Sequence, residues 1–125
     1  MSTKAAAIQG FLSGFGVPAY AAASVPDDAA EPYLTYALVD GAWGDGEVAM
    51  EVNLWYYGDG EAAPNAKVQE ISKAIGIGGT YIPCDGGAIW IKRGSPFAQS
   101  VSDGTGDDKV KRRYINLDLE YITPY

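Results

Sequence analysis

The sequence predicts an α+β fold, in which a mainly antiparallel sheet of four to five strands carries two helices packed on one face. Two segments place apolar residues at helical spacing, and others alternate apolar and polar residues or are rich in β-branched and aromatic ones. Short turns join most of the strand segments, as in antiparallel sheets. With 125 residues, 47% of them hydrophobic, the chain is expected to form a single structural domain over 1–125.

The first helix is predicted within residues 1–16 by four apolar side chains at positions i, i+3, i+4 and i+7. These residues are Ile8, Phe11, Leu12 and Phe15. Residues 17–32 hold three prolines and two aspartates and are expected to form a long connection. The remaining residues, 33–125, are expected to hold the sheet and the second helix.

Two strands are predicted next. Residues 33–39 are rich in β-branched and aromatic side chains, and residues 47–57 alternate in polarity. The side chains expected to face the core are Val48, Met50, Val52, Leu54 and Tyr56. Those expected on the opposite face are Glu47, Glu51, Asn53, Trp55 and Tyr57. The turn-forming segment DGAWGDG lies between the two strands, so we expect them to pair as a hairpin.

The second helix is predicted over 64–75, where apolar residues again recur at helical spacing and Pro64 suits the first helical position. Gly76 is suited to end this helix, with Ile77 closing over its last turn.

Further strands follow the second helix. Residues 85–87, Asp-Gly-Gly, predict a tight hairpin turn between strands over 80–84 and 88–94. Residues 97–101 are a candidate short strand, and the final strand is predicted over 109–122. Its core-facing residues are expected to be Ile115, Leu117, Leu119 and Tyr121.

The residue types limit the chemistry. The chain has no histidine, and Cys84 is its only cysteine. Imidazole-based acid–base catalysis, histidine metal sites and an intrachain disulfide are therefore excluded. We expect no catalytic residue, metal or cofactor, and no membrane partner, since no segment approaches about 18 unbroken apolar residues. One functional class that remains open is a small-molecule-binding or hydrolytic domain, and a pocket with two facing carboxylates would favour it.

Positive charge is concentrated near the C-terminus of a chain with net charge −7, because four of its nine basic residues lie within 109–113. One interpretation is a charged strand end that blocks edge-to-edge pairing of sheets. The other is a contact between subunits, in which arginines meet carboxylates of a neighbouring copy. The residues expected in that contact are Lys111, Arg112, Arg113, Glu47 and Glu51. The negative net charge disfavours direct DNA binding.

Aromatic residues are numerous, with nine tyrosines and three tryptophans. Trp43, in the predicted turn, and Trp55 and Tyr57, on the outward strand face, are candidates for contacts with partner proteins. The alternative for Trp55 is that it covers a helix or packs against a neighbouring strand.

Three segments together carry a resemblance to a known family: EISKAIG (70–76), GGAIWIKRGSPFAQ (86–99) and KRRYINLDLEY (111–121). With the order of helices and strands over the whole chain, they resemble the tail-terminator, or tail-completion, proteins of long-tailed bacteriophages. Members of that family are also described as minor capsid or head–tail joining proteins. The connection at 17–32 has no counterpart in the resemblance.

The resemblance implies a virion structural protein that forms a ring, commonly of six copies, on the last ring of the tail tube. The partners it implies are other copies of the chain, the tail-tube protein and the head–neck connector, with DNA passing through the centre without being read. It implies no enzyme activity and no cofactor, and a place in the tail or neck of the virion after synthesis in the host cytoplasm. The alternative within the same virion is a head-closure or neck connector protein.

Overall fold

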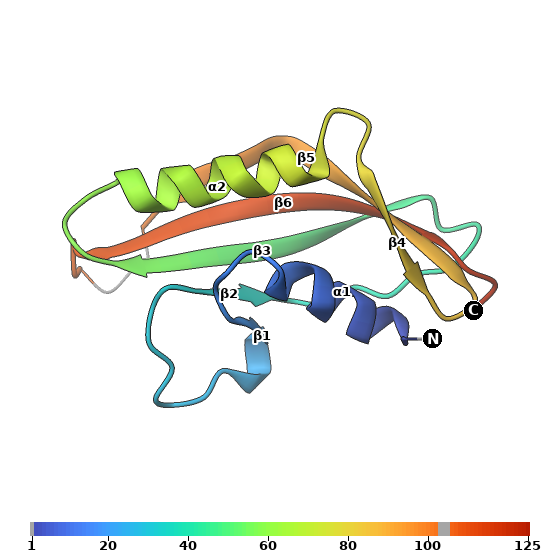
Figure 1. Cartoon of the computed structure of the whole chain (residues 1–125), viewed down its shortest axis with the longest axis horizontal. Coiled ribbons are helices and arrows are strands. Elements are labelled where there is room, and N and C mark those ends of the chain that lie inside the picture. The colour runs from blue at the N-terminus through green and yellow to red at the C-terminus, as the bar shows by residue number, and fades with distance from the viewer. Residues whose placement is uncertain (1, 103–105) are drawn as a thin grey trace.

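The structure is a computed structural model that describes residues 2–102 and 106–125. A long twisted sheet carries two helices on one side (Figure 1). The elements in chain order are α1 (Lys4–Ser13), β1 (Ala19–Ala21), the 3₁₀ turn η1 (Ala22–Ser24), β2 (Tyr33–Tyr36), β3 (Glu47–Tyr57), α2 (Ala62–Ile75), β4 (Thr80–Cys84), β5 (Gly87–Val101) and β6 (Val110–Ile122).

The strands form one six-stranded mixed sheet in the order β1-β2-β3-β6-β5-β4. β1 pairs with β2 in parallel, and the other neighbours pair antiparallel. The predicted α+β class and the pairing of β2 with β3 are confirmed. The prediction of four to five antiparallel strands is corrected to six strands in a mixed sheet.

The additional strand, β1, lies in the segment 17–32 that was expected to be only a connection. It is three residues long, too short to produce a readable alternation. Its place is fixed by tertiary contacts: Ala19 is buried opposite Leu34, and the Leu34 N–H donates to the Pro18 carbonyl at 2.8 Å. Eleven residues of connection, 22–32, then return the chain to the start of β2, which makes the pair parallel.

The first helix, α1, is shorter than the predicted span 1–16. Thr3 caps its start, because its Oγ1 accepts a hydrogen bond from the Ala6 N–H at 3.1 Å, and Gly14 follows its last residue. Ile8 and Leu12 of the predicted stripe are buried in the core. The helix therefore packs as the sequence predicts.

The second helix, α2, begins at Ala62, two residues before the predicted Pro64. Gly76 ends it with φ +78°, a conformation that favours glycine. Ile77 does not close over the last turn as predicted, because it is 99% exposed. The helix is held instead by Ile71 and Ile75, which are buried.

The core lies between the helices and one face of the sheet. The predicted alternation is confirmed in β3 and β6, whose register places Met50 opposite Leu117 and Val52 opposite Ile115. β5 adds Ile89 and Ile91 to the same face, and one cluster of buried side chains joins both helices to the strands.

The longest strand, β5, pairs with β6 on both sides of a register shift between Arg93 and Ala98. Residues 97–101, the candidate short strand, are thus the second half of β5. Gly94 lies at the shift, and a Cβ added there would be 2.7 Å from the Asn116 Cβ and 2.8 Å from the Asn116 carbonyl oxygen. Glycine at this position allows β5 and β6 to approach closely.

Candidate functional site

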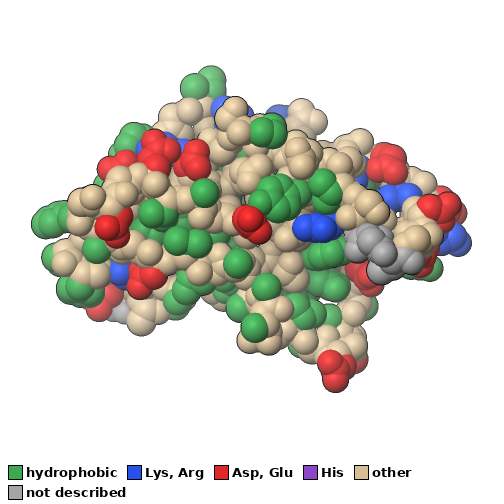
Figure 2. All heavy atoms as spheres, turned by 180° about the vertical axis from the view of Figure 1, so that it is seen from behind, with side chains coloured by type: hydrophobic (Ala, Val, Ile, Leu, Met, Phe, Trp, Pro, Cys, Tyr) green, Lys and Arg blue, Asp and Glu red, His purple; other side chains and the backbone are tan. Residues whose placement is uncertain are grey.

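Among the residues that the structure describes, no helix covers one face of the sheet, and we call it the helix-free face. The strand register and the alternation of burial place on it side chains from five strands (Figure 2). Its principal residues are Thr35, Glu47, Glu51, Asn53, Trp55, Tyr81, Trp90, Lys92, Arg112, Tyr114, Asn116, Asp118 and Glu120. Acidic side chains lie toward both the left and the right of Figure 2. On the left, where β3 begins and β6 ends, the face carries Glu47, Asp118 and Glu120 around Lys92, and we call this part the acidic half.

Lys92 organises the acidic half of the face. Its Nζ lies 3.0 Å from Glu47 Oε1 and 3.4 Å from Glu120 Oε1, and 3.9 Å from the centre of the Trp90 ring. Burial lowers the pKa of Lys92, but the contacts with Glu47 and then Glu120 outweigh burial, so the pKa is raised. One lysine is thus shared between two carboxylates, and the group retains a negative charge.

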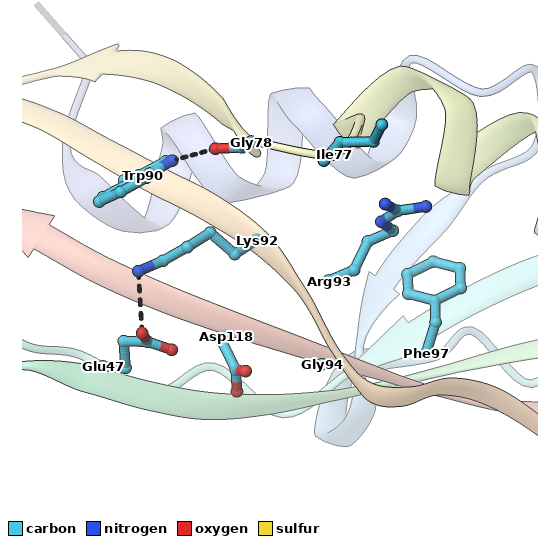
Figure 3. A pocket seen from close by; sticks show the side chains of 9 residues that line it. All are labelled: Glu47, Ile77, Gly78, Trp90, Lys92, Arg93, Gly94, Phe97 and Asp118. Atoms are coloured by element: carbon cyan, nitrogen blue, oxygen red, sulfur yellow. Dashed lines mark hydrogen bonds and ion pairs between the residues drawn. The ribbon is translucent and has the colours of Figure 1, made fainter.

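Beside this group lies an open depression of about 550 Å³ (Figure 3). Trp90 and Phe97 stand at its two ends, with the unsubstituted backbone of Gly94 between them. Its remaining lining residues are Glu47, Ile77, Gly78, Lys92, Arg93 and Asp118. Trp90 is fixed because its Nε1–H donates to the Gly78 carbonyl at 2.9 Å.

Asp118 lies in this depression between Lys92 on β5 and Ala49 on β3. Lys92 is the opposite residue in the register, yet its ammonium group is bound by Glu47 and Glu120. Within residues 2–102 and 106–125, no ion pair is formed by the Asp118 carboxylate. Its charge is therefore open to a cation from outside the chain.

Arg112 lies toward the other end of the helix-free face. Its Nε–H donates to Asn53 Oδ1 at 2.8 Å, and its guanidinium carbon is 5.4 Å from the Trp55 ring centre and 6.0 Å from that of Tyr114. Among the described residues, none of the ion pairs includes Arg112. The structure thus orients this cation without neutralising it.

A further hydrogen bond fixes one of the aromatic residues beside Arg112. Trp55 Nε1–H donates to Thr35 Oγ1 at 3.0 Å, which attaches the indole to the neighbouring strand β2. A hydrogen bond to the Glu51 carboxylate raises the pKa of Tyr114, and desolvation raises it further. Glu51, a predicted interface residue, is thus engaged by Tyr114 beside Arg112, in the same half of the face.

The other two predicted interface bases face the helices. Arg113 is 6% exposed, and its Nη2 lies 2.5 Å from Glu61 Oε1 and 2.9 Å from Asn65 Oδ1. Lys111 Nζ lies 3.6 Å from Glu61 Oε2. The hydrogen bond from Arg113 is the main cause that lowers the pKa of Glu61. Of the three predicted interface bases, Arg112 is therefore the one on the helix-free face. Its side chain and that of Arg113 lie on opposite faces of the sheet, as the alternation along the strand predicts.

The three predicted partner-contact residues differ in exposure. Trp43 is 66% exposed, in the connection between β2 and β3, and Tyr57 is 57% exposed at the end of β3. Trp55 is half-buried against Thr35 and Arg112. Trp43 and Tyr57 have the larger surfaces available for a partner.

Sequence reasoning missed the roles of Lys92 and Trp90. The alternation of β6 already places Asp118 and Glu120 on one face. Which cation each carboxylate meets depends on the register of β5 against β6, which no local pattern specifies.

Comparisons with protein-family models, curated proteins and solved structures found no match. No helix in the described part of the chain has the length and apolar character needed to span a membrane. Over the same residues, no group of three or more cysteine, aspartate or glutamate side chains is placed to hold a metal ion.

Proposed function

We propose that the protein is a virion structural subunit, a tail terminator whose copies form a ring that caps the tail tube and joins the tail to the neck. The observation that carries this proposal is the helix-free face, which has a negatively charged end and, along the same strands, an arginine without a carboxylate partner among the described residues. A ring requires two different, complementary patches on each subunit. The two differently charged ends of this face support the proposal.

The sheet edges support association through faces. β1 is three residues long, and β4, at the opposite edge, contains Pro83, which has no N–H to donate. The second half of β5 pairs only with β6 among the described strands, and Pro96 directly precedes it. Short edge strands and prolines oppose strand addition. Side-chain contacts between faces are then the available means of assembly.

The partners of the proposed ring are further copies of the chain, the tail-tube protein and the head–neck connector. Trp43 and Tyr57 are largely exposed and are our candidates for contacts with the tail-tube or neck protein. DNA passes through the centre, and the net charge of −7 per copy weakens its adhesion to the wall. The site of action is the tail or neck region of the virion, after synthesis in the host cytoplasm.

Electron microscopy of purified protein mixed with tail tubes tests this proposal. We expect rings of tail width that bind to tube ends and stop further tube growth. Rings that bind only to isolated head–neck complexes would instead identify a head-closure or neck protein. A chain that forms no ring and leaves tube ends free would contradict both assignments.

A hydrolytic domain is the second candidate, and the observation that favours it is the presence of Glu47 and Asp118 in one depression. Two carboxylates across a sugar-binding cleft are the arrangement used in glycoside hydrolysis. Hydrolysis of chromogenic glycosides by the wild-type chain, abolished in Asp118→Asn, would favour this candidate. No hydrolysis above the buffer rate by either protein would exclude glycosidase activity toward those substrates.

A further inference from the structure

Two opposite charges on the helix-free face lack an ion-pair partner within the described residues: Arg112 and Asp118. Resting on the proposed function, we infer that Arg112 of one copy inserts into the depression of the next copy and pairs with its Asp118. The partner at this surface is thus a second copy of the chain, bound head to tail.

Arg112 is oriented for such a contact. Its Nε–H is used by Asn53, and neither terminal nitrogen has an acceptor among the described residues. Trp55 and Tyr114 flank the guanidinium and restrict its motion, so less side-chain entropy is lost on binding. Two terminal N–H groups on a planar guanidinium match the two oxygens of a carboxylate.

The depression around Asp118 suits a guanidinium. Glu47, Glu120 and Asp118 surround Lys92, so this group carries a net negative charge. Phe97 offers a flat apolar surface on which an arginine can stack, whereas the Trp90 ring is already stacked on Tyr81 and covered by Lys92. Arg93, the other base of the lining, donates from Nη1 to Ser72 Oγ at 2.9 Å, which directs it toward α2.

The two charges cannot pair within one chain. Arg112 and Asp118 are six residues apart on β6, or roughly 20 Å at about 3.3 Å per residue. A neighbouring copy whose helix-free face is turned toward the first, and which is offset along the strand direction, brings one residue against the other. Each copy then offers Arg112 at one end and Asp118 at the other, which is the arrangement of a head-to-tail contact.

A strand of nucleic acid does not fit the same surface. Phosphates would approach Arg112 but would also meet Glu51, which binds Tyr114 beside it, and the acidic group around Lys92. The repulsion between phosphates and carboxylates disfavours that ligand. A carboxylate of another subunit meets only the arginine end and avoids this repulsion.

Charge reversal tests the pairing. The four proteins are the wild type, Arg112→Glu, Asp118→Arg and the double variant, each measured by native mass spectrometry and sedimentation at a series of concentrations. We expect each single variant to raise the subunit dissociation constant by about tenfold or more, and the double variant to recover most of that loss. An equimolar mixture of the two single variants should also assemble, because the glutamate introduced into one chain can meet the arginine introduced into the other.

Lys73→Glu provides the control, because Lys73 is exposed on α2 and belongs to none of the ion pairs of the described residues. It changes the net charge as Arg112→Glu does, and we expect assembly as in the wild type. Circular dichroism checks folding. If a reversed variant unfolds, Arg112→Gln and Asp118→Asn replace it, and each should weaken assembly.

The outcomes separate the two proposals. A wild-type assembly that both single variants leave unchanged overturns the Arg112–Asp118 pairing and leaves the ring itself intact. Weakened single variants without recovery in the double variant or in the mixture also overturn the pairing. A wild-type chain that stays monomeric at every concentration overturns the proposed function, and the pairing with it.

Discussion

Gly94→Ala tests the close approach of β5 and β6 that forms the depression. An alanine Cβ at this position would lie 2.7 Å from the Asn116 Cβ, 2.8 Å from its carbonyl oxygen and 3.0 Å from its carbonyl carbon. Two of these atoms are backbone atoms of β6, which pairs with β3 on its other side, so they cannot move alone. Overpacking of this kind costs about 1–3 kcal/mol. At roughly 4 °C per kcal/mol for a domain of this size, Tm should fall by about 4–12 °C.

Gly10→Ala is the matched control for this substitution. Gly10 lies within α1, and nothing comes within 4 Å of a Cβ added there. Alanine should therefore stabilise the helix by about 0.5–1 kcal/mol. Differential scanning calorimetry of both variants against the wild type gives the two shifts, which we expect to have opposite signs. A Gly94→Ala protein as stable as the wild type would refute the close approach of the two strands.

Three further results are expected. Tyr121→Phe removes the hydroxyl that donates to the Val39 carbonyl and should cost about 1 kcal/mol at neutral pH. Desolvation by burial, then Asp40 and Cys84, raises the pKa of Tyr121 to about 12. The contribution of the Tyr121 hydroxyl to stability is therefore full below pH 10 and is lost as pH rises toward 12. Chemical unfolding in alkali should show the free energy of unfolding falling over this pH range in the wild type and not in the variant. Arg113 lowers the pKa of Glu61. The stability contributed by the Arg113–Glu61 ion pair is therefore present above the ordinary carboxyl pKa of 4.5 and is lost as pH falls through the lower pKa of the folded state. An Arg113→Met protein whose Tm falls as steeply with acid as that of the wild type would contradict the ion pair. Fluorescence anisotropy should detect no micromolar binding of duplex DNA at physiological salt, whereas such binding would contradict the expected weak adhesion.

The sequence predicts the long central elements well because their periodicity is strong. The alternation in 47–57 and 109–122 and the helical spacing in 64–75 each persist over ten residues or more, and all three segments form the expected element. Thr3 caps the start of α1 and Gly76 ends α2, and both caps depend on local chemistry that needs no tertiary contact. These elements and their buried faces follow from local physics.

The remaining features depend on contacts between distant segments. β1 exists because Ala19 is buried beside Leu34, and Ile77 is exposed because the turn after α2 projects away from the sheet. The candidate site shows the same limit. Alternation along β6 separates Arg112 from Arg113, but the partners of both depend on the position of α2 and on the strand register. Sequence patterns therefore identify the charged residues but not which of them are neutralised within the chain.

The proposed function and the Arg112–Asp118 pairing both require that copies of the chain assemble into a closed ring, and native mass spectrometry of the wild-type protein decides whether they do. We expect one discrete assembly whose mass is a fixed multiple, commonly six, of the 13.2 kDa chain. A single-chain mass at every concentration, or an open-ended series of masses that grows with concentration, would contradict ring formation.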